Sequence, residues 1–116
     1  METDLIALER KIKSIIDKII AGLHHSQTNK EVFNGQIPAL KTTSNVIGNI
    51  ISSRIATEKN NLMREFLFKQ QRIMADLKIL AGLENPFEER TKIMSELYEF
   101  LEIADQILKI STRQAA

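Results

Sequence analysis

The sequence predicts an all-α protein, an elongated antiparallel bundle of three long helices at about 3–25, 40–82 and 86–110. Two observations predict this fold class. Apolar residues recur at steps of three and four through all three segments, which is the spacing of one helix face. Both prolines, Pro38 and Pro86, fall just before or at the start of a predicted helix, where proline is tolerated.

The length indicates one helical domain over residues 1–116, and with 43% hydrophobic and 27% charged residues the chain can bury a core and stay soluble. The formal net charge of +1 gives no global bias toward nucleic acid or membrane surfaces. The absence of cysteine excludes disulfides and thiolate metal sites. Because the sequence has no apolar run of about 18 residues and no visible secretory leader, we expect a cytoplasmic protein without a membrane span.

The first predicted helix, residues 3–25, has one broad apolar side and one charged side. Glu9 and Lys13 are assigned to the solvent side, four residues apart in the order that favours an ion pair. The polar run 24–27 ends the helix. The apolar side consists of Leu5, Leu8, Ile12, Ile15, Ile16, Ile19, Ile20 and Leu23.

Residues 26–43 are predicted to connect the first two helices, with only a short turn of helix near 29–34. The Asn34-Gly35 pair is typical of a turn or a helix end. The residue before a proline favours an extended backbone, so Pro38 is expected at the start of the next helix and not in its interior.

Residues 40–82 are predicted to form one continuous helix, which at 1.5 Å per residue would be about 60 Å long. Its middle, 57–61, lacks apolar residues, and Asn60 or Asn61 could cap a new helix there. The continuous helix is preferred because the middle contains neither glycine nor proline. The alternative is a break at 57–61, which gives a four-helix up-down bundle.

Small residues recur every four positions along the first half of this segment, at Ser44, Gly48, Ser52 and Ala56. Isoleucines flank them at Ile47, Ile51 and Ile55. Small side chains at this spacing let another helix approach closely. Two interpretations stay open, a crossing within the chain and a seam between two copies in a homodimer.

The second half of the segment, 62–81, is apolar on more than one side. Phe66 belongs to the main apolar stripe, and a second stripe consists of Phe68, Ala75, Ile79 and Leu83. A helix that is apolar on two sides is usually contacted from two sides. This second stripe therefore predicts a contact beyond the core of one subunit.

Local signals separate this segment from the last helix. Gly82 is expected to end the long helix in the left-handed conformation. Asn85 is a good N-cap, and Pro86 suits the first helical position of the last helix. Residues 111–116 are expected to fray.

Charge is distributed unevenly. Residues 41–83 carry seven basic and three acidic residues, a net charge of +4, whereas residues 84–116 carry four basic and seven acidic residues, a net charge of −3. The pattern predicts antiparallel packing of the long and last helices with complementary flanks.

No arrangement of residues predicts catalysis, a metal site, a cofactor or a small-molecule substrate. Adjacent helical residues such as His24 and His25 point about 100° apart, so they do not chelate as residues four apart would. The glutamates of the last helix lack the Glu-x-x-His pattern of di-metal bundles. No glycine-rich phosphate loop or nucleophile–base signature is present. We therefore expect a protein that is not an enzyme.

A basic stripe on the long helix supports an alternative function, nucleic-acid binding. Binding to phosphates needs many such charges. The acidic last helix is able to cover the stripe, and no helix-turn-helix pattern with a short glycine turn is found. The side chains that would contact phosphates are Arg64, Lys69, Arg72 and Lys78, with Arg54 and Lys59 nearby.

The preferred hypothesis is a helical protein-interaction module, an adaptor or a chaperone-like protein, that forms a homodimer or offers an apolar groove to a helical partner segment. In outline such a protein resembles the small helical chaperones and adaptors of bacterial secretion and flagellar export, by architecture alone. The predicted surface for self-association or partner binding consists of Ile47, Gly48, Ile51, Ser52, Ile55, Phe66, Phe68, Ile79 and Leu83.

Overall fold

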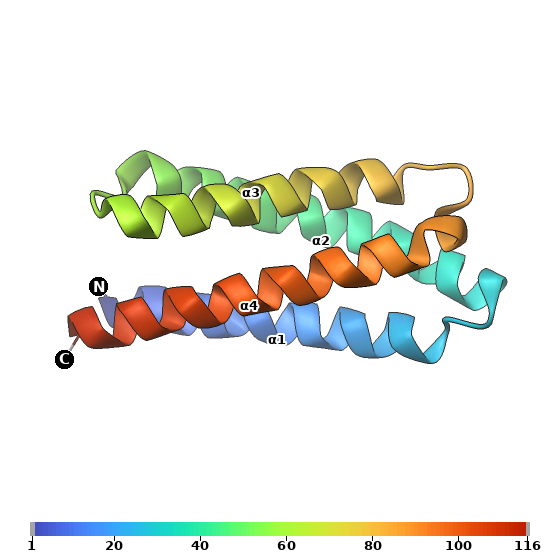
Figure 1. The fold of residues 1–116 in the computed structure, drawn as a ribbon, viewed down its shortest axis with the longest axis horizontal. Helices are drawn as coiled ribbons and strands as arrows, with labels where there is room; N and C mark the ends of the chain where they lie inside the picture. Colours follow the sequence, from blue (N-terminus) through green and yellow to red (C-terminus); the bar gives the residue numbers. More distant parts are fainter. Residues whose placement is uncertain (1, 116) are drawn as a thin grey trace.

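The computed structural model describes residues 2–115 as an antiparallel four-helix bundle (Figure 1). Its principal extents are 46 × 22 × 18 Å, so the bundle is about as long as its longest helix. The elements in chain order are α1 (Glu2–His25), α2 (Lys30–Thr57), α3 (Asn61–Ala81), the 3-10 helix η1 (Pro86–Glu89) and α4 (Arg90–Ala115). The all-α class is confirmed.

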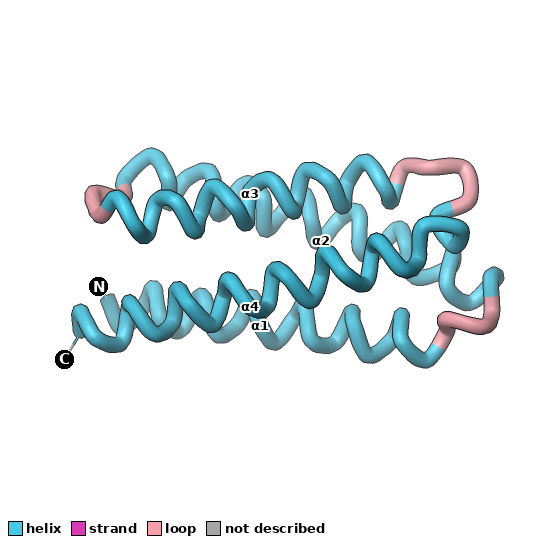
Figure 2. Tube along the Cα trace, viewed as in Figure 1, coloured by secondary structure: helices cyan, strands magenta, loops and turns pink. Residues whose placement is uncertain are grey.

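The continuous helix over 40–82 is wrong, and the alternative with a break at 57–61 is confirmed. α2 ends at Thr57 and α3 begins at Asn61, with a tight turn between them (Figure 2). The Asn60 side chain caps α3 by accepting a hydrogen bond from the Met63 backbone N–H at 3.0 Å. This cap and the absence of apolar residues at the turn let the chain reverse, which brings the apolar sides of α2 and α3 together.

The predicted connector is also wrong, because α2 begins at Lys30 and runs through Asn34-Gly35 and Pro38. Proline inside a helix costs about 3 kcal/mol, because it removes one backbone hydrogen bond and crowds the preceding turn. Burial of apolar side chains offsets this cost, since Phe33 and Ile37 are almost fully buried in the core. Tertiary packing therefore overrides the local signal.

The junction between α3 and α4 differs from the prediction in its details. Gly82 ends α3 with φ −89° and ψ −2°, a right-handed conformation, and its N–H donates to the carbonyls of Lys78 and Ile79. A tightened last turn thus replaces the predicted left-handed cap. Asn85 precedes η1, and Pro86 occupies its first position as predicted. The Asn85 side chain, however, accepts a hydrogen bond from the Asn34 side-chain amide and none from the helix backbone.

The helix α4 begins at Arg90 and continues to Ala115, beyond the predicted end at 110. Residues 111–115 belong to the helix, and Ala116 lies outside the described residues, so the fraying of 111–116 stays a prediction. Hydrogen bonds from the Thr112 hydroxyl to the carbonyls of Leu108 and Lys109 lie in this last part of the helix.

The four helices form two pairs, α2 with α3 and α1 with α4, which face one another across the core (Figure 1). Contacts between α3 and α4 join the pairs more closely than contacts between α1 and α2. Core residues follow alternating steps of three and four, the repeat of coiled-coil-like bundles. On α2 they are Phe33, Ile37, Leu40, Ser44, Ile47, Ile51 and Arg54, and on α3 Met63, Leu67, Gln70, Met74 and Leu77.

Candidate interaction surface

The outward face of α3 carries large apolar side chains that are open to solvent. Phe68 exposes 45% of its surface and Ile79 exposes 68%. Together with Arg72 and Ala75, which are also exposed, they follow one another at steps of four, three and four. This spacing places all four on one side of the helix. We call Phe68, Arg72, Ala75 and Ile79 the α3 outward stripe.

Only part of the predicted interaction surface is accessible. Ile47, Ile51 and Ile55 of α2 are buried in the core of the bundle and are therefore not part of its accessible surface. Ile47 and Ile51 belong to the buried repeat of α2, and Ile55 is buried next to Arg54. Phe66 is half-buried and packs against the core. The accessible apolar members are Phe68, Ile79 and Leu83.

The small residues of α2 lie where α2 crosses α3 of the same chain. A Cβ atom added to Gly48 would lie 3.7 Å from the Met74 Cβ, an ordinary van der Waals distance. The Ser52 hydroxyl accepts a hydrogen bond from the Gln71 amide at 2.7 Å. A shallow hollow of about 160 Å³ runs beside this crossing. The close approach that the small residues allow is therefore made within one chain.

Three of the four basic residues predicted to contact phosphate have partners within the bundle. The Arg64 guanidinium donates to the carbonyls of Ile55 and Glu58, at 3.1 and 3.2 Å, which ties the α2–α3 turn. Lys78 donates a hydrogen bond to the Asn45 side chain at 3.0 Å. The Lys69 ammonium lies 5.6 Å from the centre of the Phe66 ring.

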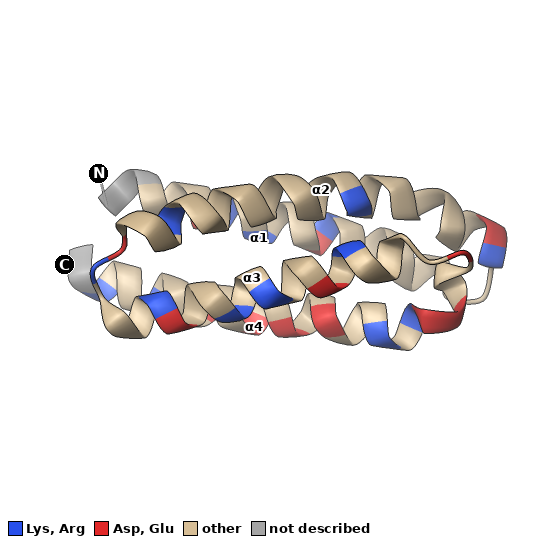
Figure 3. Cartoon of the chain, turned by 90° about the horizontal axis from the view of Figure 1, so that it is seen from above, with Lys and Arg blue, Asp and Glu red and all other residues tan. Residues whose placement is uncertain are grey.

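Two other basic residues show how these charges are spread. Arg72 is exposed within the α3 outward stripe, whereas Arg54 is buried. Figure 3 shows basic residues distributed along α3, next to acidic residues of α4. The structure therefore does not gather the predicted basic residues into one phosphate-binding row.

Carboxylates of α3 and α4 lie close together on the flank of the α3 outward stripe that faces α4. Burial raises the pKa of the Glu96 carboxyl on α4, and the nearby carboxylates of Asp76 and Glu99 raise it further, against the effect of Lys92. The two ion pairs found among the described side chains, those of residues 5–113, join α1 to α4 and α1 to α2, and neither involves α3. The predicted complementary flanks of α3 and α4 are thus wrong at Asp76, where like charges meet.

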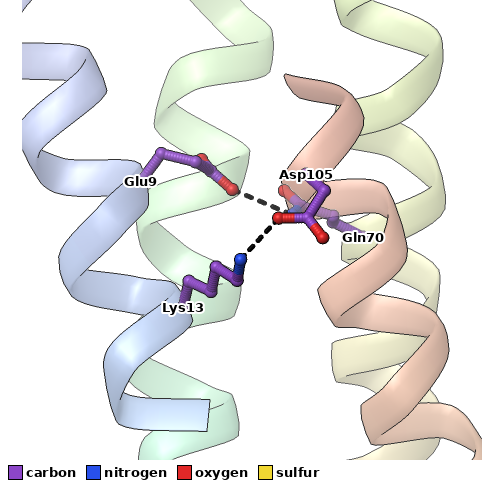
Figure 4. Close-up of polar contacts among 4 residues, drawn as sticks. All are labelled: Glu9, Lys13, Gln70 and Asp105. Atoms are coloured by element: carbon purple, nitrogen blue, oxygen red, sulfur yellow. Dashed lines mark hydrogen bonds and ion pairs between the residues drawn. The ribbon is translucent and has the colours of Figure 1, made fainter. Parts of the chain in front are cut away.

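A buried polar cluster lies on the inner side of the same helix. The Glu9 carboxylate of α1, with almost no exposure, accepts hydrogen bonds from the Arg54 guanidinium of α2 and from the Gln70 amide of α3. Figure 4 shows Glu9 and Gln70 reaching toward one another, beside the more exposed pair of Lys13 and Asp105. We call Glu9, Arg54 and Gln70 the polar layer.

Sequence reasoning missed the polar layer because it assigned Glu9 to the solvent side of α1. The signal was in the phase of the apolar repeat. Glu9 precedes Ile12 and Ile16 at steps of three and four, and Arg54 and Gln70 occupy the corresponding positions in α2 and α3. Charged residues at core positions are rarely buried unless they are paired, so this phase predicts a buried pair.

The remaining candidate groups show little arrangement for chemistry. His24 and His25 are exposed at the end of α1, with ring centres 6.2 Å apart and planes at 70°. Among the side chains of residues 5–113, which the structure describes, no three His, Asp or Glu groups gather closely enough to hold a metal ion.

None of the described helices combines the length and apolarity needed to cross a membrane.

Comparisons of the chain with protein-family models, with curated proteins and with solved structures give no significant match.

Proposed function

We propose that this protein is a helical protein-interaction module and that the α3 outward stripe is its docking surface. The observation that carries the proposal is the exposure of Phe68 and Ile79 on a helix whose inner side already completes the core. Two large apolar side chains eleven residues apart lie about 17 Å apart along a helix. This length and spacing suit an amphipathic helix laid along α3.

The side chains around the stripe support a protein partner. Arg64 lies with its guanidinium carbon 5.8 Å from the Phe68 ring centre, so the exposed ring is bordered by a cation. Glu65, Lys69 and Asp76 border the opposite side of the stripe. An apolar centre with a charged rim of both signs is typical of protein interfaces.

The proposal is tested by comparing Ile79→Asp with Val46→Asp. Val46 is an exposed aliphatic residue of α2, 52% accessible, and provides a control for the same chemical change away from α3. Each variant is tagged and expressed in the source cell, and captured proteins are quantified by mass spectrometry against the unsubstituted chain. We expect Ile79→Asp to lose a specifically captured protein, this chain included, that Val46→Asp retains. Equal recovery by both variants would place the docking surface elsewhere.

Nucleic-acid binding is separated from this proposal by a gel-shift assay at low and moderate salt. Electrostatic binding to phosphates weakens steeply with salt. We expect no shift at low salt, and a shift that Arg72→Gln reduces would favour the nucleic-acid function instead.

A further inference from the structure

We propose that the occupant of the α3 outward stripe is the same stripe of a second copy of this chain, packed antiparallel about a two-fold axis between Ile73 and Met74. This inference rests on the proposed function, because it takes the stripe as the docking surface and names the partner. Three features of α3 carry it: the spacing of the stripe, the charges beside it and the size of the contact.

The first feature is the symmetry of the spacing. Steps of four, three and four read the same in both directions along the helix, with their centre between Ile73 and Met74. A two-fold contact pairs each residue with its counterpart across the axis. Phe68 of one copy therefore faces Ile79 of the other, and Arg72 faces Ala75. The small Ala75 side chain leaves room for the aliphatic part of Arg72.

The second feature is charge. A two-fold axis across antiparallel helices brings the same flank of both copies together. Lys69 and Asp76 share one flank of the stripe, and Arg72 lies on the same side of its midline. At this register the carboxylate of Asp76 falls between Lys69 and Arg72 of the second copy. Each dimer contains this arrangement twice.

The same charges disfavour the parallel alternative. In a parallel two-fold pair each stripe residue would face its own copy, so Arg72 would oppose Arg72. Like charges placed opposite one another penalise an interface. The Asp76 carboxylate lies close enough to Glu96 of α4 for the two carboxylates to repel one another. Cations from a second copy would relieve this repulsion, and the antiparallel arrangement supplies Lys69 and Arg72.

The third feature is size. The stripe spans about three helical turns, so contact along α3 alone lies at the small end of interfaces, near 1,200 Å² of total buried surface. We therefore expect a reversible dimer that dissociates in the micromolar range. This also explains why the stripe combines apolar residues with an arginine, since the surface must stay soluble in the free monomer.

Cross-linking tests the arrangement directly, because the chain has no cysteine of its own. Phe68→Cys and Ile79→Cys are prepared separately, and a short thiol-specific cross-linker is added to each variant and to their mixture. We expect cross-linked dimer mainly in the mixture, where the two cysteines face one another. Within either variant alone they lie about 17 Å apart along the helix axis. Val46→Cys mixed with Ile79→Cys measures random collision.

Sedimentation of the unsubstituted chain at about 10–500 µM measures the dimer itself. We expect the mass to approach twice the 13.2 kDa of the monomer as concentration rises. Ile79→Asp should stay monomeric, whereas Val46→Asp should dimerise like the unsubstituted chain. A monomer throughout this range, or efficient cross-linking of Phe68→Cys with itself, would overturn the antiparallel dimer.

The two proposals fail in distinguishable ways. If the chain stays monomeric but Ile79→Asp still loses a captured protein that Val46→Asp retains, the stripe binds a different partner and only the dimer is refuted. If the chain is monomeric and both variants capture the same proteins, the docking surface is refuted as well. Circular dichroism of each variant confirms that its helices are retained.

Discussion

Each side of α3 departs from the usual distribution of polar and apolar residues at one or two positions. Its inner side contributes Gln70 to a buried polar layer, whereas its outer side exposes Phe68 and Ile79. Burying the polar Gln70 side chain costs desolvation energy, which only a hydrogen-bond partner within the chain offsets. The outer departure leaves apolar surface that a partner outside the chain could cover. The comparison suggests that polar groups specify how the helices assemble internally, and apolar groups specify what the bundle binds.

The largest expected effect tests the inner side. Arg54→Met leaves the buried Glu9 carboxylate with only the Gln70 amide as a hydrogen-bond donor. Removing one partner of a buried ion pair typically costs about 3–5 kcal/mol, and we expect that loss in the free energy of unfolding, measured with urea. Adding Glu9→Leu to the same chain should recover most of it, because no unpaired buried charge remains.

The neighbouring ion pair is the matched control. Lys13 lies one turn from Glu9 on α1 and pairs with Asp105 of α4, with side chains 33% and 48% exposed. Exposed pairs are worth about 0–1 kcal/mol, so Lys13→Met should change stability by no more than this. Equal costs for Lys13→Met and Arg54→Met would mean that the polar layer is not special to the fold.

The second prediction tests the outer side through a change whose two effects have opposite signs. Asp76→Lys removes a like-charge neighbour of Glu96 and should make the monomer slightly more stable. In the proposed dimer it places a lysine near Lys69 and Arg72 of the second copy, twice per dimer. We expect the dissociation constant of the dimer to rise by about tenfold, measured by sedimentation.

The control for this charge reversal is Glu65→Lys, which changes the charge by the same amount on the same flank but far from the two-fold axis. We expect a smaller change in the dissociation constant than for Asp76→Lys. If the two variants weaken the dimer equally, net charge controls association and the proposed register is wrong.

The third prediction concerns the inner contact of α3 with α2. Because a Cβ at Gly48 would lie at an ordinary contact distance from Met74, Gly48→Ala fits the crossing without displacement. Alanine is favoured over glycine in a helix by about 1 kcal/mol, so we expect a gain of roughly 0.5–1 kcal/mol in the free energy of unfolding. Gly35→Ala, where nothing lies within 4 Å, gives the gain expected without any contact.

A loss of stability for Gly48→Ala alongside a gain for Gly35→Ala would show that the α2–α3 crossing is closer than this structure describes. Equal gains would show that the crossing tolerates a methyl group and depends on the larger core residues around it.

These variants also show which features of the fold were predictable from sequence. Helix periodicity is a repeated signal, so the helical class, both ends of α1 and the C-terminal end of α3 were found to within a few residues. The break before Asn61 was foreseen only as an alternative, because a single asparagine cap competed with a long segment free of glycine and proline. The start of α2 was missed, because burial of Phe33 and Ile37 outweighs the local effect of Pro38.

The residues of the candidate surface also divide into those that local sequence predicted and those that it did not. Phe68 and Ile79 were predicted from a second apolar stripe, a signal that lies within one helix. Which isoleucines of α2 would be covered depended on the packing of the other helices, and local sequence does not contain that information. Glu9 was misplaced because its charge was given more weight than its phase in the apolar repeat.

The smallest expected effect is the pH dependence of stability that arises from Glu96, where α4 lies beside α3. Glu96 has a pKa raised above its ordinary value in the folded protein, first by burial and then by Asp76 and Glu99. The folded state therefore binds the proton more tightly than the unfolded state, so the charged carboxylate lowers stability above the raised pKa. As pH falls through the raised pKa toward the ordinary value of 4.5, this penalty disappears.

Glu96→Gln removes the titrating group while keeping its shape. We expect the variant to be more stable than the unsubstituted chain by a few tenths of a kcal/mol near pH 7, since the site is partly screened by solvent. The difference should shrink as the pH is lowered below 5, measured by urea unfolding at each pH. Glu102→Gln, an exposed carboxyl on the outer side of α4, is the control and should show a smaller pH-dependent difference. If Glu96→Gln is instead less stable at neutral pH, its carboxylate is held by a favourable contact, and the like-charge rim that a second copy would neutralise does not exist.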